Sequence, residues 1–415
     1  MERFFIVKGL TFKIYNHIRE LPNNWDDVAV SNVFLQTHYL EVLEKSAPTN
    51  MQCFYIGIFE NQELIGVSLA QYLDLNKLES FGERDKCFKT FIRNFIFKNF
   101  ASHTLFLGNN MITGQNGYAF SKEIDFEHIS EILMESAKEI TTYFKNKKIK
   151  IHLVSFKDFY EHCSVELKKF SLSNTYEFNT QPNMIFYLDK KWKNKEDYIA
   201  TFSKKYRDQY KRAHKKFDGI HVKELNLDEV ILHEETIYDL YHYVAKNAPF
   251  NTFFLAKNHF STMKKQCQNH FLIFGYFLKD KLVGFHTILL NGTVLETYFL
   301  GYDSQVQKEN MLYLNMLYNM TEYGIEKGFE KIIFGRTALE IKSSIGAIPI
   351  NMSGFIYHNN KLINKYIEYF FKKLEPEAEW QMRHPFKEVG STKLEVRNTK
   401  YEVRNTKYNL KSFEF

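Results

Sequence analysis

Residues 271–300 read FLIFGYFLKDKLVGFHTILLNGTVLETYFL, and residues 301–346 read GYDSQVQKENMLYLNMLYNMTEYGIEKGFEKIIFGRTALEIKSSIG. Two apolar runs joined by a polar turn at 279–281 predict a hairpin, and a third strand follows at 293–300. A polar loop over 304–309 then leads into a helix over about 310–327, and a last strand follows at 331–334. Because a loop that feeds a helix N-terminus presents unpaired backbone N–H groups, this stretch predicts the active cleft.

A weaker copy of this pattern occurs in the first half of the chain. Residues 54–70, FYIGIFENQELIGVSLA, parallel residues 272–288, LIFGYFLKDKLVGFHTI, with Gly66 and Gly284 in register. In each half a further strand, a loop, a long helix and another strand come next. This order predicts two tandem copies of one α/β (α+β) domain, each a mixed, mostly antiparallel sheet flanked by helices. A chance likeness between two hairpins is the alternative.

The expected domain boundaries follow from this duplication. We expect an N-terminal domain over 1–180 and a C-terminal domain over 181–387, with a repetitive tail over 388–415. In the tail, residues 395–401 read EVRNTKY and residues 402–408 repeat them without a change. Two short copies are too few to bury a core, so the tail is predicted to be flexible and to take no part in chemistry.

Composition is that of a globular protein with reduced cysteines. The chain has 415 residues, 44% of them hydrophobic, and its four cysteines form no C-x-x-C pair. Residues from 390 onward carry six Lys/Arg against three Asp/Glu, about half of the net charge of +6, so the global charge does not indicate nucleic-acid binding. No signal peptide and no apolar run of about 20 residues is evident, which predicts a cytoplasmic protein without stable membrane insertion.

The most regular helix of the chain is predicted over 195–217, at the start of the second domain. Its apolar residues recur at steps of three or four, and its other faces are strongly basic and include Lys211 and Arg212. A solvated face is the ordinary interpretation. The alternative is a basic lip over the cleft that binds a phosphate-bearing or RNA substrate.

Several kinds of catalytic site are not indicated. The chain contains no G-x-S-x-G, no P-loop and no suitably placed G-x-G-x-x-G. His233 and His242 are nine residues apart, which places them on opposite sides of a helix, and no metal site is predicted.

Polar groups converge in the second copy instead. Glu296 and Tyr298 lie two residues apart on one face of a strand, where a carboxylate or a phenol can take a proton from an attacking amine. A backbone N–H at Leu300 or Gly301 can stabilise a tetrahedral oxyanion. If the strands that carry Glu296 and Arg336 diverge, a thioester arm fits between them.

The residues after the last strand complete the candidate set. Arg336, Glu340 and Lys342 are expected to bind substrate, together with Lys211 and Arg212 of the basic helix. For each of these side chains, packing or a salt bridge is the alternative to a role in the reaction.

At these residues the sequence resembles the GNAT (Gcn5-related N-acetyltransferase) superfamily. More narrowly, it resembles the FemABX-like, peptidoglycan-bridge branch, in which two GNAT-like domains lie in tandem. The likeness rests on an aromatic strand followed by Tyr-Asp, a helix that ends in Glu-Lys-Gly, and then Phe-Gly-Arg with a Lys before the next Gly. The basic helix before a short strand is also typical of this branch. The resemblance spans about residues 10–387 and is clear in the second half.

The resemblance implies an acyltransferase with an amine acceptor. Its donor is acetyl-CoA or another acyl-CoA in most GNAT enzymes, and aminoacyl-tRNA in the bridge-forming ones. The family's pyrophosphate loop, Gln/Arg-x-x-Gly-x-Gly/Ala, is absent here, and Gln307, Lys308, Glu309 and Asn310 stand at the corresponding place as the expected cofactor contacts. The inserted helical arm that grips tRNA in some bridge-forming enzymes is not evident.

Three functional hypotheses remain open. The first is an N-acyltransferase that moves an acyl group from acyl-CoA to an amine by direct attack, in cell-envelope or peptidoglycan-related metabolism. The second is an aminoacyl-tRNA-dependent transferase that modifies a cell-wall precursor. The third, which rests on the missing glycine loop, is a non-catalytic binding protein that keeps the scaffold.

Overall fold

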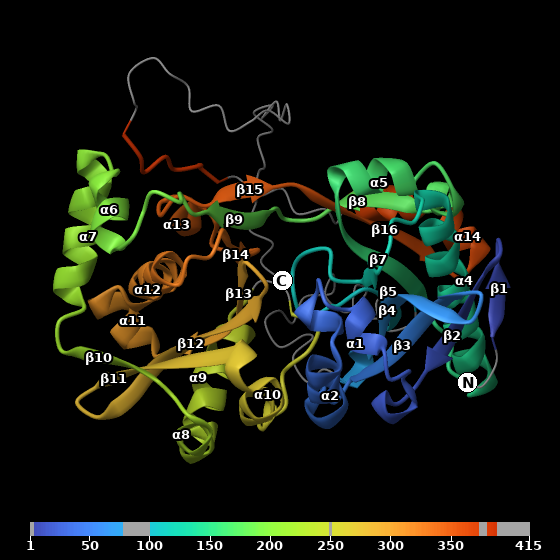
Figure 1. Ribbon diagram of the computed structural model, residues 1–415, viewed down its shortest axis with the longest axis horizontal. Helices are drawn as coiled ribbons and strands as arrows, with labels where there is room; N and C mark the ends of the chain where they lie inside the picture. Colours follow the sequence, from blue (N-terminus) through green and yellow to red (C-terminus); the bar gives the residue numbers. More distant parts are fainter. Residues whose placement is uncertain (1–3, 78–99, 249–250, 373–379, 388–415) are drawn as a thin grey trace, which may run out of the picture.

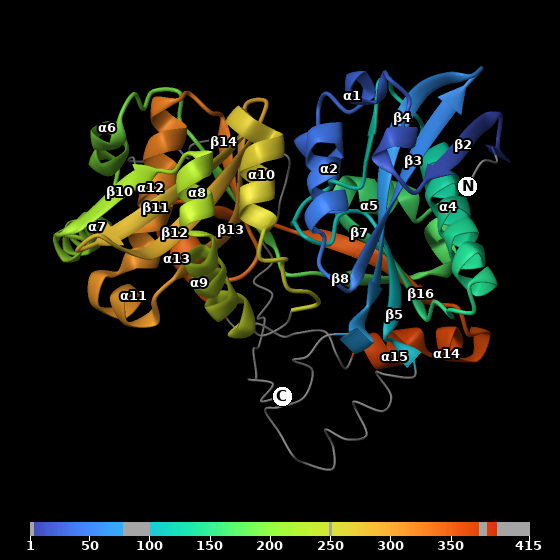
Figure 2. The same ribbon diagram turned by 90° about the horizontal axis from the view of Figure 1, so that it is seen from below.

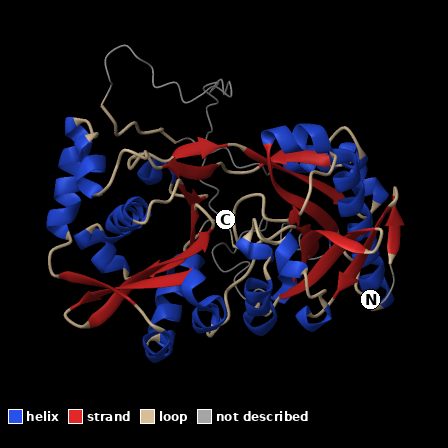
Figure 3. Ribbon diagram, in the orientation of Figure 1, coloured by secondary structure: helices blue, strands red, loops and turns tan. Residues whose placement is uncertain are grey.

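The chain forms two sheets that lie side by side, each flanked by helices (Figures 1 and 3). The computed structural model describes residues 4–77, 100–248, 251–372 and 380–387. The predicted class, two mixed sheets with helices in an α/β (α+β) arrangement, is confirmed. The repetitive tail over 388–415 lies outside the described residues.

The first sheet contains most of the N-terminal half. Its strand order is β1-β2-β3-β4-β5-β7-β16-β8, and β6 pairs with β4. The strands are β1 (Phe5–Val7), β2 (Leu10–Tyr15), β3 (Met51–Glu60), β4 (Glu63–Asp74), β5 (His103–Leu107), β6 (Tyr118–Phe120), β7 (Leu153–Tyr160), β8 (Tyr176–Asn179) and β16 (Met352–His358). Only β5 and β7 pair in parallel among them.

The second sheet has the order β10-β11-β12-β13-β14-β9-β15. Its strands are β9 (Asn183–Tyr187), β10 (Ile220–Glu224), β11 (Phe271–Leu278), β12 (Lys281–Asn291), β13 (Val294–Tyr302), β14 (Lys331–Gly335) and β15 (Ile348–Ile350). Here β13 and β14 form the parallel pair, so both sheets place a parallel pair after an antiparallel hairpin.

The two halves repeat one another in detail. The hairpins β3–β4 and β11–β12 both shift register just beside their matched glycines, between Ile58 and Phe59 and between Tyr276 and Phe277. Gly66 pairs with Ile58, and Gly284 pairs with Tyr276. A β-bulge is a specific local feature, so its presence at the same place in both hairpins supports the duplication over a chance likeness.

Helices and short 3-10 turns flank both sheets. The longer and more central ones are α2 (Thr37–Ser46), α4 (Phe126–Asn146), α7 (Lys204–Lys216), α9 (Glu234–Lys246), α10 (His259–Cys267) and α12 (Leu312–Glu326). The shorter ones are α1 (Trp25–Val28), α5 (Glu161–Leu167), α6 (Lys195–Ala200), α8 (Leu227–Leu232), α11 (Ser304–Asn310), α13 (Leu339–Ser343), α14 (Lys361–Lys365) and α15 (Ile367–Lys372). The 3-10 turns are η1 (Ile18–Glu20), η2 (Val33–Leu35), η3 (Leu75–Lys77), η4 (Ser171–Asn174) and η5 (Gln268–His270).

One apolar core is shared by the two halves. It combines side chains of α1 and α2 with side chains of α9, α10 and the inner face of β12. Figure 2 shows α2 and α10 facing each other between the two sheets. A second core packs α7 and α12 against the outer face of the second sheet. The inner face of the second sheet therefore looks toward the N-terminal half, and its outer face looks away from it.

A two-stranded ribbon crosses from one sheet to the other. Strands β8 and β16 pair in the first sheet, and β9 and β15 pair in the second, with short connections between them. Figure 1 shows this ribbon running across the top of the molecule. The sheets thus do not follow the expected boundary at residue 180, because β16, from the C-terminal part of the chain, completes the N-terminal sheet. The domain limits remain a prediction.

The predicted basic helix over 195–217 is interrupted and forms α6 and α7. At the interruption Phe202 forms a β-bridge with Phe386, and Ser203 N donates to Pro385 O at 2.8 Å. Lys387 N in turn donates to Thr201 O at 2.9 Å. Residues 385–387, which are far away in the sequence, therefore form hydrogen bonds with backbone groups that a continuous helix would pair internally. The local sequence pattern did not indicate this pairing.

The expected loop over 304–309 is also wrong, since these residues form α11. The Asp303 carboxylate accepts hydrogen bonds from the backbone N–H groups of Gln305 and Val306 and so caps the helix. Gln305 donates to Glu309 one turn later. Met311 then adopts a left-handed conformation, with φ of 51°, and separates α11 from α12.

Candidate active site

Strands β13 and β14 separate soon after they meet. They pair at three positions, the last of which joins Glu296 to Ile333. Beyond this point β13 contains a bulge, where Tyr298 and Phe299 together oppose Thr287 of β12. The Thr287 hydroxyl donates to Phe299 O at 2.6 Å and fixes the bulge. We call the edge of β13 beyond Glu296, which β14 does not pair, together with the end of β14, the β13–β14 notch.

The backbone of β13 offers polar groups to the notch. Asp303 N donates to Val283 O at 2.8 Å, so Gly301, two residues earlier, also directs its backbone groups to β12. By the same alternation Leu300 and Tyr302 direct theirs to the opposite edge, which β14 no longer pairs. Of the two predicted oxyanion donors, Leu300 therefore faces the notch, whereas Gly301 faces β12.

The end of β14 is held in place by Lys342. Its ammonium group is buried and donates to the carbonyl oxygens of Phe334, Gly335 and Arg336, at 2.7, 3.3 and 2.6 Å. Burial lowers the pKa of Lys342 to about 7. Because all three donors of an ammonium are used here, Lys342 supports the wall of the notch and does not reach a substrate.

Glu296 lies where the strands part. It is 6% exposed, on the inner face of the sheet, and its Oε1 accepts a hydrogen bond from Asn291 Nδ2 at 3.4 Å. Burial raises the pKa of its carboxyl to about 7. Tyr160 of the N-terminal half is near enough for the Glu296 charge to add to the burial that raises the Tyr160 pKa. A carboxyl with such a pKa is half ionised at neutral pH, as a general base requires.

The N-terminal copy has no corresponding notch among its described residues. Strand β5 pairs with β7 up to its last residue, Leu107. Next, the ammonium of Lys157 donates to Asn109 O at 3.3 Å and to Asn110 Oδ1 at 3.4 Å. The protein's own side chains thus fill the place that the second copy leaves open.

The fold is similar to that of a solved structure, although the sequence matches no known family. No family model and no curated protein matches the sequence. Among solved structures, FemX has a TM-score of 0.52 at 13% identity, covering 86% of this chain and 100% of the FemX chain. This protein has a fold like that of FemX.

Two further structures are less similar. The tandem GNAT protein from the clavulanic acid biosynthesis pathway has a TM-score of 0.46 at 9% identity, over 84% of this chain and 98% of its own. L-PGS from Bacillus licheniformis has a TM-score of 0.45 at 12% identity, over 81% and 95%. At such identities the comparison establishes only the likeness in fold to FemX.

Tyr298 lies in the interface between the N-terminal and C-terminal halves and not in the notch. A hydrogen bond of 3.0 Å joins its hydroxyl to Nε2 of His259, which is fully buried. Nδ1 of His259 lies 3.2 Å from the hydroxyl of Ser46 in the N-terminal half, and burial lowers the pKa of His259 to about 4. The ring of Tyr39 packs edge-on against Tyr298. These contacts join the two halves, so we expect Tyr298 to stabilise the fold.

The variant Tyr298→Phe tests this assignment. It removes the hydroxyl from a buried pair with His259, and we expect the free energy of unfolding to fall by about 1–2 kcal/mol. Turnover should change by less than about threefold, since a general base contributes about 100-fold or more. Urea unfolding with Tyr302→Phe as the control measures the first effect. A tenfold loss of turnover without loss of stability would return Tyr298 to the chemistry.

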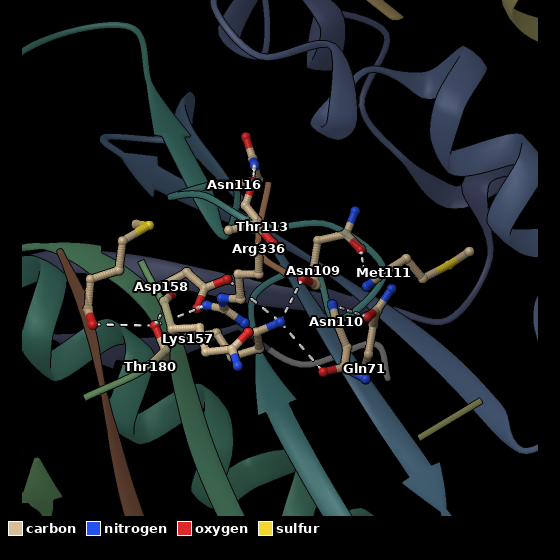
Figure 4. A network of polar contacts seen from close by, with 12 residues as sticks. Gln71, Asn109, Asn110, Met111, Thr113, Asn116, Lys157, Asp158, Thr180 and Arg336 are labelled. Carbon is tan, nitrogen blue, oxygen red and sulfur yellow. Dashed lines mark hydrogen bonds and ion pairs between the residues drawn. The ribbon is translucent and has the colours of Figure 1, made fainter. Parts of the chain in front are cut away.

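Arg336 connects the end of β14 to the N-terminal half (Figure 4). Its Nη2 donates to the carboxylate of Asp158 and, at 3.1 Å, to Thr180 Oγ1. Asp158 is 1% exposed, has φ of 59°, and also lies 3.6 Å from the ammonium of Lys157. Arg336 was predicted to bind substrate, and the structure places it in this buried ion-pair cluster at the edge of the notch.

The junction where a pyrophosphate was expected is closed by side chains. Oε1 of Gln307 accepts a hydrogen bond of 2.9 Å from Tyr313 N, one of the first amides of α12. Asn310 Nδ2 donates to Lys216 O at 2.7 Å and ties the junction to α7. Lys308 and Glu309 lie on the same short helix, α11. The N-terminus of α12 is therefore already partly satisfied by the protein itself.

The remaining predicted residues lie away from the notch. The Glu340 carboxylate binds Arg383 at 2.7 Å and accepts from Gln381 N at 3.1 Å, and these contacts lower its pKa. Lys211 and Arg212 are exposed on α7, which packs on the outer face of the sheet. Figure 1 shows α7 at the end of the molecule farthest from the N-terminal half. The basic helix is therefore not a lip over the notch.

Sequence reasoning missed the N-terminal contributors to the interface. Lys157 and Asp158 follow the last predicted strand of the first copy, as Gly335 and Arg336 follow that of the second. The shared Phe before each pair was the available signal. No such signal was available for His259, because the neighbouring sequence does not distinguish a buried histidine from an exposed one. No group of three or more metal-ligating side chains, and no helix that could cross a membrane, occurs within the described ranges.

Proposed function

We propose that this protein is an acyltransferase that moves an acyl group onto an amine by direct attack, with the β13–β14 notch as its active site. The observation that carries the proposal is Glu296, a buried carboxyl with a pKa of about 7 at the point where the two strands separate. It takes the proton from the amine as the nitrogen attacks the acyl carbon. The fold supports this assignment by analogy only.

Each wall of the notch has a part in this proposal. The Leu300 N–H donates to the tetrahedral oxyanion, because its strand edge has no partner strand there. The donor arm lies along the same edge and pairs with the backbone of Leu300 and Tyr302 as an added strand would. Lys342 keeps the end of β14 in place. The acceptor amine enters from the inner face, on which Glu296 lies.

For the donor, we propose acyl-CoA, with acetyl-CoA as the first compound to test. An aminoacyl-tRNA is the second candidate, and the contact between Gln307 and Tyr313 N favours it, because that amide is not free for a pyrophosphate. An amine of a cell-wall precursor is the proposed acceptor in either case. The contact predicts that acetyl-CoA binds weakly unless Gln307 moves.

Binding of the donor tests the proposal before any acceptor is known. Acetyl-CoA is titrated into the protein by calorimetry, with Gln307→Ala as the variant and Gln305→Ala as a control on the exposed side of α11. We expect saturable binding that Gln307→Ala strengthens by about tenfold, since it frees one amide, worth about 1.4 kcal/mol. If neither acetyl-CoA nor a charged tRNA binds, the transferase assignment fails and a non-catalytic role remains.

A further inference from the structure

A cavity of about 160 Å³ lies on the outer face of the second sheet, between α6, α7 and α12. Its walls belong to the core on the α12 side, whereas Glu296 faces the N-terminal half. The cavity is therefore separated from the β13–β14 notch by the sheet itself. The side chains that matter for its chemistry are Tyr210, His214, Phe217, Asn315, Tyr318 and Asn319.

Aromatic rings give the cavity flat walls. Tyr210 and His214, one turn apart on α7, have ring centroids 5.9 Å apart and are nearly parallel, at 7°. Tyr318 of α12 meets Tyr210 edge-on, with centroids 5.0 Å apart. Walls of this kind favour a planar ring, which can stack on one face and meet an edge on another.

The polar part of the wall accepts hydrogen bonds. Asn315 Nδ2 donates to Ala213 O and Met311 O, both at 3.1 Å, and Asn319 Nδ2 donates to Tyr276 OH at 3.1 Å. The amide nitrogens are thus engaged, and within the described residues neither amide oxygen has a hydrogen-bond donor. Two free acceptors on one wall select a ring that carries N–H donors.

Positive charge lies beside the cavity. On α7, Lys211 and Lys215 each follow a wall residue by one position and form the next row along the helix, four residues apart and exposed. Arg212 and Lys216 are exposed as well and lie one row further round the helix, and Lys216 directly precedes the wall residue Phe217. At the cavity wall Lys195 binds Glu322 at 2.9 Å, so these two charges offset each other.

We propose that this cavity binds a nucleobase with an exocyclic amine, adenine or cytosine, and that Lys211 and Lys215 bind the phosphates attached to it. The base stacks among Tyr210, His214 and Phe217 and donates its amine hydrogens to the amide oxygens of Asn315 and Asn319. This site goes beyond the proposed transfer reaction, which needs neither the cavity nor α7. Its ligand is a free nucleotide or the unpaired end of an RNA, which share this chemistry.

Binding of defined nucleotides tests the site. The probes are adenosine 5′-monophosphate, hexa-adenylate RNA, hexa-uridylate RNA and an abasic hexamer with the same phosphates, each measured by fluorescence anisotropy or by competition. We expect hexa-adenylate to bind at least tenfold more tightly than the abasic hexamer, because one stacked base is lost. Hexa-uridylate should bind more tightly than the abasic hexamer, because uracil still stacks, but more weakly than hexa-adenylate, because uracil has no exocyclic amine.

Two sets of variants separate stacking from charge. Tyr210→Leu and the exposed His214→Ala should each weaken hexa-adenylate binding by about tenfold or less while binding of the abasic hexamer is unchanged. Replacing Lys211 and Lys215 with Ala should reduce the slope of log K against log salt by about 1.4. The matched control, Lys361 and Lys365 to Ala, removes the same charge from two exposed positions four residues apart on α14, beside the N-terminal sheet, and should leave most of the slope.

The outcomes also distinguish the two sources of the base. Equal affinity for the monophosphate and hexa-adenylate would assign a free nucleotide, and much tighter binding of the hexamer would assign an RNA end. Equal binding of the abasic and adenylate hexamers would overturn the proposal, as would full affinity in both Tyr210→Leu and His214→Ala with an unchanged melting temperature. None of these measurements uses acyl transfer, so they stand apart from a failure at Glu296.

Discussion

Replacing Glu296 with Gln is expected to lower kcat by about 100-fold or more while the substrate constant changes little. The amide keeps the shape of the side chain but cannot accept a proton from the amine, and general bases contribute about 100-fold to 10,000-fold. In the wild type, kcat/KM should rise with pH to a plateau, with a midpoint near 7, the pKa to which burial raises this carboxyl. The variant should lose this limb of the profile.

The same variant should be more stable than the wild type at alkaline pH. Burial raises the pKa of Glu296 from 4.5 to about 7, so the folded state pays for ionising this group and the unfolded chain does not. Below about pH 4.5 the carboxyl is neutral in both states, and the wild type loses stability as pH rises from 4.5 to about 7, above which the loss is complete. The shift corresponds to about 3 kcal/mol, so Glu296→Gln should gain about that much at pH 8 and nothing at pH 4.

Urea unfolding at pH 4, 6 and 8 measures this difference directly. Glu326→Gln is the control, because it makes the same chemical change at an exposed position on α12 of the same half. A Glu296→Gln variant that is less stable than the wild type at pH 8 would show that the carboxylate is stabilised by its surroundings. The assignment of Glu296 as the base would then be wrong.

Replacing Arg336 with Met should destabilise the protein by about 3 kcal/mol. Its partner Asp158 is 1% exposed, so the variant leaves a buried carboxylate with Lys157, 3.6 Å away, as its remaining cation. The cluster joins the end of β14 to the end of β7, and its loss should also loosen the wall of the notch. Combining Arg336→Met with Asp158→Asn should recover much of the loss, because the unpaired charge is then gone.

An exposed pair provides the comparison for Arg336. Arg383 binds Glu340 at 2.7 Å, but their side chains are 32% and 46% exposed. Arg383→Met should therefore cost less than about 1 kcal/mol, as surface ion pairs do. Chemical denaturation of all three variants gives the ordering. Equal losses in Arg336→Met and Arg383→Met would contradict the buried cluster.

The hairpins and the duplication were predictable from sequence because they depend on local information. Alternating apolar residues and short polar turns specify β3–β4 and β11–β12, and the matched Gly66 and Gly284 fix the repeat. The interruption of the basic helix was not predictable, since Phe202 pairs with Phe386. The exchange of β16 into the first sheet has the same origin, a pairing between distant segments.

In the candidate site, too, the features that depend on local sequence were predictable and those that depend on distant segments were not. Glu296 and the edge at Leu300 follow from strand periodicity, whereas the divergence of β13 and β14 entered the sequence analysis only as a condition for a donor site. The bulge that moves Tyr298 out of the notch depends on Thr287 of another strand. The roles of Lys342 and Arg336 depend on which distant groups they meet, and periodicity carries no information about those partners.

The titration of the Glu296 carboxyl is the most direct test, because it needs no substrate. The infrared band of a protonated carboxyl is recorded from pH 4 to pH 9 as the difference between the wild type and Glu296→Gln. A midpoint near pH 7 is expected for a buried base at the mouth of the β13–β14 notch. A midpoint near pH 4.5, the ordinary value of a solvated glutamate, would contradict that assignment.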